Sequence, residues 1–321
     1  MTLMPPSFRR SMRRLVNLPR FGPVGLHPPQ QLIEVFLEGL GEPRNVTRNN
    51  VVAALRPFTI GIMFETSSSP VEGQRMRLCF SERGGSKSLL GAFDLRMVSD
   101  VKLPEHRFCL FETSDGENRC VSVVNLGLYH LAERLRAETR RRKNPYNFQM
   151  EQGDLRRNHI FYICPRPVVL VTVEHQGAGN MFPMDLIGPT DSPWYSMALR
   201  LTSPAVRLMQ ESRRMALASV PLVDKDIAYQ LGRHHRKTSI DWACLPFSTR
   251  PSPLFGLPVP EKAFRVFEVT VAEFRDVGSH KLFVTSVVSD TGRECSTANE
   301  NSLELFHAFS SYRQFLAMQQ Q

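Results

Sequence analysis

Two short stretches of the chain hold residues that could bind a flat, phosphorylated molecule. The first is GNMFPMDLIGP at 179–189, in which methionine, phenylalanine and leucine side chains surround a single acid, Asp185. Pro183 has no backbone N–H, so it argues against a central strand that pairs on both sides. A flat and partly apolar ligand could therefore lie against this backbone.

The second stretch is Thr202-Ser203-Pro204, which we expect at the start of a helix. Ser203 can cap the helix and Pro204 is favoured at its first position. Free N–H groups at a helix start bind phosphate, and Arg200 and Arg207 flank the same turn. Capping alone also explains Ser-Pro at this place, so phosphate binding and simple capping both stay open.

Other familiar chemical signatures are absent from the sequence. It has no Walker loop, no GxGxxG, no HExxH and no GxSxG. The pair His234-His235 points in opposite directions on a helix or strand, which argues against a metal site. The six cysteines show no zinc spacing, and several lie in apolar runs. Free thiols of this kind favour a reducing compartment, and we expect the cytoplasm.

The elements that must position these stretches are mostly strands. In the second half we expect strands at 166–173, 194–201, 215–221, 264–274 and 280–290, with helices at about 204–214 and over DKDIAYQLG. In the first half, helical spacing predicts a helix within 29–41. A meander of strands follows at 58–64, 74–80, 88–98, 106–112 and 119–124.

Two further helices complete the expected elements. One covers about 126–142, with Leu128, Leu131 and Leu135 facing inward. The other is an amphipathic helix within 296–321. The two halves share only a vague strand-rich texture, RPFTIGIMF against RPVVLVTV, so no internal repeat is expected.

Bulk properties narrow the class of protein. The 321 residues can form two domains, and no apolar run approaches the roughly 18 residues of a membrane-spanning helix. The net charge of +9 is concentrated at the start, where 33 residues hold five arginines and no acid. A solvated basic arm explains this better than nucleic-acid binding. No apolar block follows the arginines, so a cleaved signal peptide is not expected.

Residues of about 160–290 resemble the flavin reductase-like domain, an FMN-binding split β-barrel, and most closely its flavoredoxin-type branch. The family segment N-x-x-P-x-S corresponds to Asn180–Asp185, and the family's phosphate loop to Leu201–Val206. A late family element with a histidine corresponds to Gly278–Val287. The chain departs from the family at Asp185, where Ser or Thr is usual, and at Thr-Ser-Pro, which replaces Lys-Asp-Thr.

The resemblance implies a β-rich α+β fold in which an antiparallel, Greek-key-like split barrel follows a β-rich domain with flanking helices. The expected parts are a basic arm (1–28), an α+β domain (29–150), the barrel (151–295) and a C-terminal helix (296–321). The isoalloxazine ring would lie beside Asn180, Pro183, Met184, Asp185, Leu186 and Ile187. The phosphate would contact Thr202, Ser203 and Arg207, and His280 would lie at the nicotinamide side.

The activity that the resemblance implies is an oxidoreductase of the flavin reductase type. It would pass electrons from NAD(P)H to FMN and then to free flavin, a quinone-like acceptor or a partner oxygenase. A homodimer with flavin at its interface is expected. The alternative is a flavin- or planar-ligand-binding interaction protein without turnover. It is favoured by Asp185, because a nearby acid disfavours an anionic reduced flavin, and by the altered phosphate loop.

Overall fold

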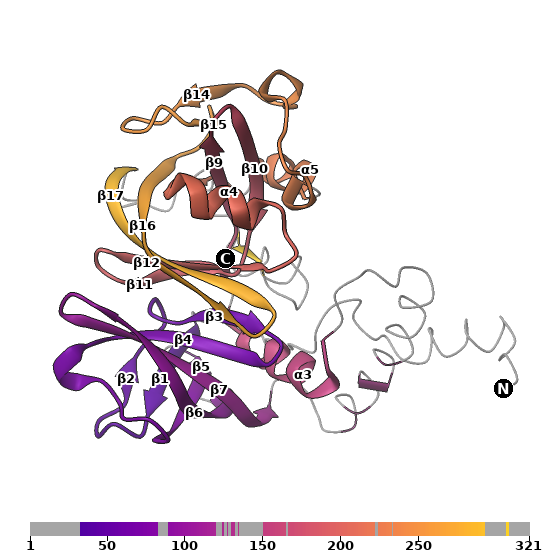
Figure 1. Cartoon of the computed structure of the whole chain (residues 1–321). Helices are drawn as coiled ribbons and strands as arrows, with labels where there is room; N and C mark the ends of the chain where they lie inside the picture. Colours follow the sequence, from indigo (N-terminus) through magenta and orange to yellow (C-terminus); the bar gives the residue numbers. More distant parts are fainter. Residues whose placement is uncertain are drawn as a thin grey trace, which may run out of the picture.

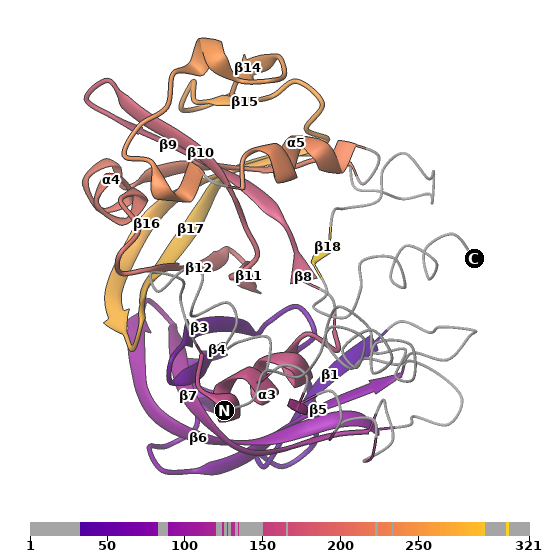
Figure 2. The ribbon, with the colours of Figure 1, turned by 90° about the vertical axis from the view of Figure 1, so that its right-hand side faces the viewer.

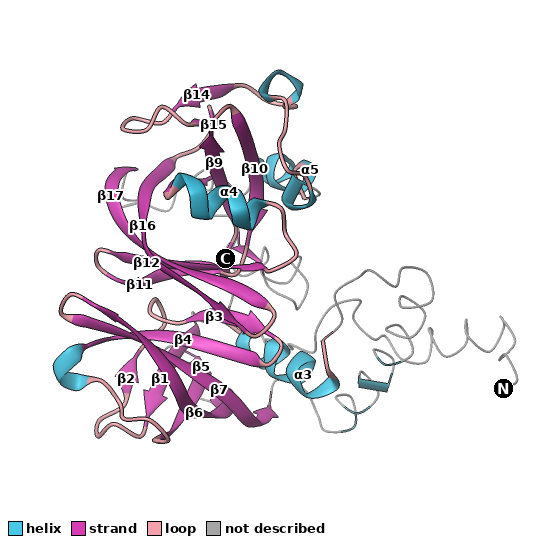
Figure 3. Cartoon of the chain, in the orientation of Figure 1, coloured by secondary structure: helices cyan, strands magenta, loops and turns pink. Residues whose placement is uncertain are grey.

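Two antiparallel sheets of seven strands each are the main elements of the chain in its computed structural model (Figure 1). Both sheets, with a few short helices packed against them, stand out when the chain is coloured by secondary structure (Figure 3). The structure describes residues 33–82, 89–119, 150–164, 166–221, 224–232, 234–292 and 306–307, together with Val124, Gly127, His130, Leu131 and Arg134.

The first sheet is formed by residues 33–118. Its strands are β1 (Ile33–Glu38), β2 (Arg44–Asn45), β3 (Val51–Leu55), β4 (Phe58–Glu65), β5 (Arg75–Glu82), β6 (Leu89–Leu103) and β7 (His106–Asn118). They hydrogen-bond in the order β2-β1-β5-β6-β7-β4-β3. A 3-10 turn, η1 (Thr66–Ser68), follows β4, and the helix α3 (Gln152–Phe161) packs against β4, β6 and β7.

The second sheet is formed by residues 169–292. Its strands are β9 (Val169–His175), β10 (Ala178–Met184), β11 (Ile187–Asp191), β12 (Trp194–Arg200), β13 (Arg214–Ser219), β16 (Arg265–Val277) and β17 (His280–Gly292). Their order is β10-β9-β13-β16-β17-β12-β11. The helices α4 (Ala205–Ser212) and α5 (Lys225–Gln230), the 3-10 turns η3 (His234–Arg236) and η4 (Trp242–Cys244), and the hairpin of β14 (Thr249–Pro251) and β15 (Pro258–Pro260) fill the connections.

The second sheet curls so that two strands adjacent in sequence lie at its opposite edges. β10 pairs only with β9, and β11 pairs only with β12, among the described strands. The chain passes from one edge to the other through Asp185 and Leu186. The rotated view shows the open side of this curl (Figure 2). The expected antiparallel split barrel is confirmed.

The expected helix within 29–41 is wrong, because residues 33–38 form β1. Ile33, Val35 and Leu37 are buried while the residues between them are partly exposed, which is the alternation of a strand with one inward face. All six residues of β1 pair with β5. The spacing of apolar residues here fits both periods, and pairing with a neighbouring strand determines the outcome.

Three other expectations change. Residues 119–124 do not form the expected strand where they are described: β7 ends at Asn118, and Val124 is helical. Leu131 lies in the expected helix but is 51% exposed, so it does not face inward. Of the C-terminal helix, only residues 306–307 are described, and they form β18 (Phe306–His307) because they pair with β8 (Arg166–Pro167). The rest of that helix, most of the helix expected at 126–142 and the arm at 1–28 lie outside the described residues.

Contrary to the expectation of no repeat, the two sheets have the same strand order. Strands β1 to β7, taken along the chain, correspond to β9, β10, β11, β12, β13, β16 and β17. With this correspondence the order β2-β1-β5-β6-β7-β4-β3 becomes β10-β9-β13-β16-β17-β12-β11. Every neighbouring pair is antiparallel in both sheets.

The remaining described residues add little to the question of class. No described helix has both the length and the apolar character needed to cross a membrane. The described cysteines are free, and three of them, Cys79, Cys109 and Cys164, are buried. Their burial agrees with cysteines that serve as small apolar side chains.

Candidate functional site

The stretch 179–189 forms the seam of the second barrel. Pro183 lies on the edge strand β10, opposite Leu170 of β9. An edge strand pairs on one side only, so it tolerates a residue without a backbone N–H. Met184 and Ile187 are buried in the core of the second barrel, whereas Leu186 packs into the core cluster of the first half. The seam is therefore held from both halves of the chain.

Asp185 is the acid of this seam, and its carboxylate is hydrogen-bonded from the first half. The hydroxyl of Tyr162, which follows α3, donates to Oδ2 of Asp185 at 3.1 Å. Burial, followed by the charge of Asp185, raises the pKa of Tyr162 well above its ordinary value, so the hydroxyl keeps its proton and remains a donor.

Arg200 and His280 lie opposite each other where β12 ends and β17 begins. Burial, together with the positive charge of Arg236, lowers the pKa of Arg200, and the carboxylate of Asp185 opposes that shift. Burial also lowers the pKa of His280 to about 4, with Arg200 acting in the same direction and Asp185 against it. The ring is consequently neutral near pH 7.

His280 is enclosed by the first half of the chain. Its side chain is almost fully buried, and Nδ1 lies 2.8 Å from Oγ of Ser279 and 3.4 Å from the backbone N of Leu55 in β3. The sequence placed this histidine at the nicotinamide side. In the structure the ring is buried and contacts the backbone of Leu55 in the first half of the chain.

Asn180 and Ser203, predicted to contact different ends of the ligand, hold one and the same segment, residues 234–237. Nδ2 of Asn180 donates to the carbonyl oxygens of His234 and Lys237, both at 2.9 Å. Oγ of Ser203 donates to the carbonyl oxygen of His235 at 2.7 Å. These bonds place the run HHRK over the end of β12 and the start of α4.

Basic side chains gather at this place. Arg236 and Arg200 are close enough that each contributes to lowering the pKa of His235, after burial. Arg236 is exposed, and no salt bridge of Arg236 occurs within the described part of the chain. We define Arg200, Ser203, His235 and Arg236 as the basic cluster. A phosphate is the chemistry that fits two guanidinium groups.

Thr202 and Arg207 take less part than the sequence predicted. Thr202 is exposed beside the cluster. Arg207 points to solvent from α4, and its Nε is 2.8 Å from Oε1 of Glu211, one helical turn further on. An exposed pair at this spacing is typical of a helix surface. Of the two, Arg236 is the arginine whose charge acts on Arg200 and, in addition to burial, lowers its pKa.

The sequence contained a signal for this cluster that was not used. The run His234–Lys237 directly follows a helix and its terminal glycine, and it was considered only as a metal site. Among the described residues, no group of histidine, cysteine and acidic side chains could hold a metal ion. A run of basic residues could equally have been tested as a phosphate contact for Arg200.

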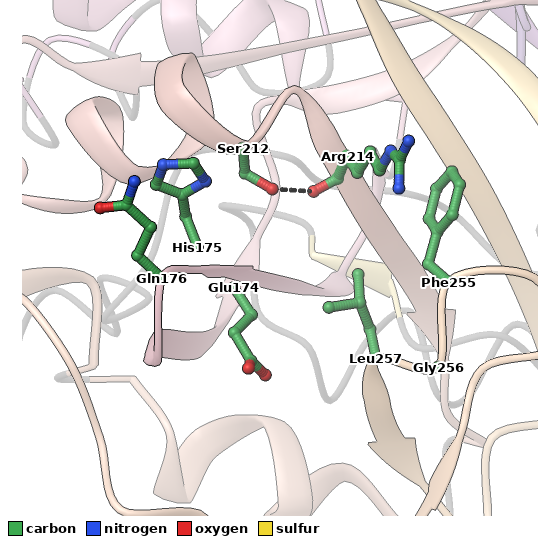
Figure 4. Close-up of a pocket in the computed structure, with 8 residues that line it drawn as sticks. All are labelled: Glu174, His175, Gln176, Ser212, Arg214, Phe255, Gly256 and Leu257. Carbon is green, nitrogen blue, oxygen red and sulfur yellow. Dashed lines mark hydrogen bonds between the residues drawn. The ribbon is translucent and has the colours of Figure 1, made fainter.

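One cavity of about 470 Å³ lies elsewhere, between the far ends of β9 and α4 and the loop before β15 (Figure 4). It is lined by Glu174, His175, Gln176, Ser212, Arg214, Phe255, Gly256 and Leu257. None of the residues predicted from the sequence lines it. Its polar groups are partly occupied with each other, since Oγ of Ser212 donates to the carbonyl oxygen of Arg214 at 3.1 Å.

Comparison with known proteins identifies the segment that contains the seam and the cluster. Residues 161–315 match the family model of the flavin reductase like domain. No curated protein matches the chain in sequence.

Solved structures similar to this chain include three flavin proteins. An FMN-binding protein from Thermus thermophilus is 22% identical, over 45% of this chain and 82% of its own, with a TM-score of 0.40. An NADH:FAD oxidoreductase from Streptomyces globisporus is 14% identical, over 52% and 96%, with a TM-score of 0.44. A styrene monooxygenase flavin reductase from Pseudomonas putida is 15% identical, over 48% and 93%, with a TM-score of 0.39.

Proposed function

Because residues 161–315 form a flavin reductase like domain, we propose that the protein is an FMN-binding oxidoreductase that takes electrons from NAD(P)H. The family match supports flavin binding and flavin reduction in general. The finer claims, FMN rather than another flavin and a nicotinamide as electron donor, are part of this proposal.

The observation that carries the proposal is the position of the basic cluster beside the seam. A flavin mononucleotide has a flat ring at one end and a phosphate at the other. The seam offers the ring the backbone from Met184 to Ile187, and the cluster offers the phosphate the guanidinium groups of Arg200 and Arg236, while Ser203 holds the segment that carries Arg236. Oδ1 of Asn180 is buried without a hydrogen-bond partner among the described residues, so the seam also holds an unused acceptor.

The protein residues would bind and orient the cofactor, which itself supplies the transfer of hydride and single electrons. Arg200 and Arg236 would hold the phosphate dianion. Asn180 keeps the segment 234–237 in place, and so positions Arg236. Asp185, fixed by Tyr162, would place a negative charge near the ring and so make the reduced, anionic form of the ring less favourable.

Electrons would leave to a free flavin, a quinone-like acceptor or a partner oxygenase. The acceptor, like the location in the cytoplasm, stays a prediction. An experiment that names it is oxygen-free reduction of the protein, followed by addition of each acceptor class in turn and measurement of the reoxidation rate.

A second candidate is a protein that binds flavin without turnover, and two observations favour it. His280, expected beside the nicotinamide, is enclosed by the first half, and Asp185 stands where the family usually has Ser or Thr. The variant Asp185→Ser distinguishes the two readings. Turnover already present in the unchanged protein supports the enzyme, whereas turnover that appears only in the variant supports the second candidate.

The test of the leading proposal is a titration of the full chain with FMN, followed by fluorescence quenching, and then NADH and NADPH oxidation at 340 nm. We expect saturable binding in the micromolar range or tighter and oxidation of at least one nicotinamide. Absence of FMN binding at tens of micromolar would remove both candidates. Binding without oxidation would leave the second.

A further inference from the structure

The correspondence between the two sheets extends to single residues in their long hairpins. In β6–β7 and in β16–β17 a two-residue turn precedes a histidine, His106 or His280. Leu103 faces His106 across the first turn, and Val277 faces His280 across the second. The two hairpins can therefore be numbered from the same point.

Counted from these turns, an irregularity of the pairing falls at the same place in both hairpins. In the first, Met97 pairs with Phe111 and Ser99 with Leu110, so one residue is left over between Met97 and Ser99. In the second, Val271 pairs with Thr285 and Glu273 with Val284. A bulge at the same position, with the same register on both sides, is a specific feature of a fold and not a general property of antiparallel sheets.

The neighbouring strands agree. Arg75-Met76-Arg77-Leu78 opens β5 as Arg214-Met215-Ala216-Leu217 opens β13, and each pairs with the corresponding part of β6 or β16. The hairpins β3–β4 and β11–β12 each contain a bulge near the turn, two pairs from the turn in the first and one pair from it in the second. The first half of the chain is thus a barrel of the same design as the one that residues 169–292 form. We call it the first barrel, and the family match over residues 161–315 does not include it.

The surface between the barrels is built from corresponding positions on both sides. One core cluster contains Phe108 and Leu110 of β7 together with Leu282 and Val284 of β17. In sequence, Phe108 follows His106 by two residues and Leu110 by four, just as Leu282 and Val284 follow His280. β3 contacts β11 and β12, and β4 contacts β11 in turn. An interface in which the same patch occurs on both partners is the isologous contact of a two-fold dimer.

The turn of the second long hairpin closes this interface at one end. Ser279 donates its backbone N–H to the carbonyl oxygen of Arg56, at 2.8 Å. Gly278 has a φ of 50°, and a Cβ at this position would collide with that same carbonyl oxygen. Nη1 of Arg275 donates to the carbonyl oxygen of Asp100 at 2.7 Å. The contact between the barrels is therefore made by the backbone as well as by side chains.

We propose that this chain is a two-subunit assembly contained in one polypeptide. The first barrel takes the place of a second subunit, and the protein works as a monomer with one candidate site. This inference does not depend on whether the protein binds flavin. It is an alternative to the homodimer that the resemblance implies.

The first barrel keeps the interface and lacks the site. The position that faces His106 across β4 and β7 is Glu65, whereas Arg200 faces His280 in the second barrel. After β4 comes only the short turn η1, in place of α4. Only six residues separate β5 from β6, whereas β13 and β16 are separated by the long connection that carries Arg236. Among the described residues of the first barrel, Glu65 at the place of Arg200 and the turn η1 at the place of α4 leave no counterpart of Arg200 and Ser203.

The experiment is sedimentation equilibrium of the full chain over roughly a hundredfold range of concentration. We expect a single species at the monomer mass of 36.6 kDa. A species of twice that mass, populated at micromolar concentration, would overturn the proposal.

A variant then tests whether the interface joins the barrels within one chain. Leu282→Asp puts a charge into the shared cluster, and we expect faster hydrogen exchange in β3 and β11 with the mass unchanged. A milder variant, Leu282→Ala, covers the case in which the first fails to fold. Leu254→Asp, at a residue 58% exposed and outside the interface, is the matched control and should leave exchange in β3 unchanged. Unchanged exchange in β3 in both Leu282 variants would contradict the proposed interface.

Discussion

The hydroxyl of Tyr162 and the carboxylate of Asp185 are joined by a hydrogen bond of 3.1 Å, although Tyr162 packs in the core of the first barrel and Asp185 lies at the seam of the second. The acid that distinguishes this seam from that of the family is therefore fixed by a residue that packs in the core of the first barrel and lies just inside the family match, which begins at residue 161. The two halves share one site as well as one interface.

Removing this hydroxyl should weaken the contact between the halves. Tyr162→Phe leaves the ring in place and deprives a partly buried carboxylate of its donor, which costs about 1.5–3 kcal/mol for a bond to a charged group. The free energy of unfolding, from urea denaturation, measures the loss. In an Asp185→Asn background the same change should cost clearly less. An equal cost in both backgrounds would show that the bond is not what the hydroxyl contributes.

From the basic cluster we predict that Arg236 contacts the phosphate. Arg236→Ala should weaken FMN binding by roughly tenfold or more, because a charge-assisted phosphate contact contributes about 1.5–3 kcal/mol. Riboflavin, which has the ring without the phosphate, should bind both proteins equally. The matched control is Arg207→Ala, at an arginine paired with Glu211 on the surface of α4. If Arg207→Ala weakened FMN binding as much as Arg236→Ala, the cluster would be wrongly assigned.

Much of the second barrel could be predicted from local pattern. The strands at 166–173, 194–201, 264–274 and 280–290 correspond to observed strands, because their apolar residues alternate or run continuously and turn residues bound them. The segment within 29–41 was predicted as a helix because Ile33 and Leu37 fit both periods: they share a helix face with Phe36 and a strand face with Val35. Only pairing with β5, a non-local contact, separates the two.

The duplication was invisible for a related reason. What the two halves share is a strand order, the register of the long hairpins near their turns and the position of one bulge there, and these are properties of pairing between distant segments. Few identical side chains accompany them, with Arg75, Met76 and Leu78 against Arg214, Met215 and Leu217 as the clearest instance. A barrel needs apolar residues of suitable size on its inner face and does not need particular ones.

The residues of the candidate site also fall into those that a local motif predicts and those that only distant contacts bring to the site. Asn180, Asp185 and Ser203 were predicted from a contiguous motif or from a helix start, and the structure places all three around the seam. Arg236 and Tyr162 were missed, because each reaches the site from a segment that is remote in sequence. Arg207 and His280 were chosen by position in a motif, and the structure gives each of them a different partner.

Hydrogen bonds to Glu268 hold the loop beside the cavity. Its buried carboxylate accepts hydrogen bonds from Oγ of Ser252 at 2.6 Å and from the backbone N–H groups of Leu254 and Phe255. Glu268→Gln keeps the shape but turns an amide N–H₂ group toward these donors. We expect a loss of about 2–3 kcal/mol in the free energy of unfolding, since a buried polar group loses its partner.

The same variant should speed hydrogen exchange at Leu254 and Phe255, which locates the effect in the loop. Ser252→Ala removes one of the donors and should have the smaller effect. A Glu268→Gln protein as stable as the unchanged one would show that the loop is held by its apolar contacts alone.

The buried ring of His280 should make the free energy of unfolding depend on pH. Burial, then the charge of Arg200, lowers the pKa of its ring from 6.5 to about 4, against the opposing charge of Asp185. Between these two values the unfolded chain binds a proton that the folded chain does not. The free energy of unfolding therefore falls as the pH drops from about 6.5, and the contribution levels off below about 4. The full effect is roughly 3 kcal/mol at about 1.4 kcal/mol per pKa unit.

His280→Gln removes the titration while keeping a polar side chain that can meet Ser279 and the N–H of Leu55. Urea midpoints at about pH 7, 6, 5 and 4.5 measure the effect for both proteins. Carboxylates and the other histidines titrate equally in both, so only the difference between the two curves reports on His280. We expect that difference to shrink steadily from pH 7 to pH 4.5. Parallel curves would mean that the ring binds a proton as readily in the folded protein as in the unfolded chain, and the neutral, enclosed histidine between the two barrels would have to be abandoned.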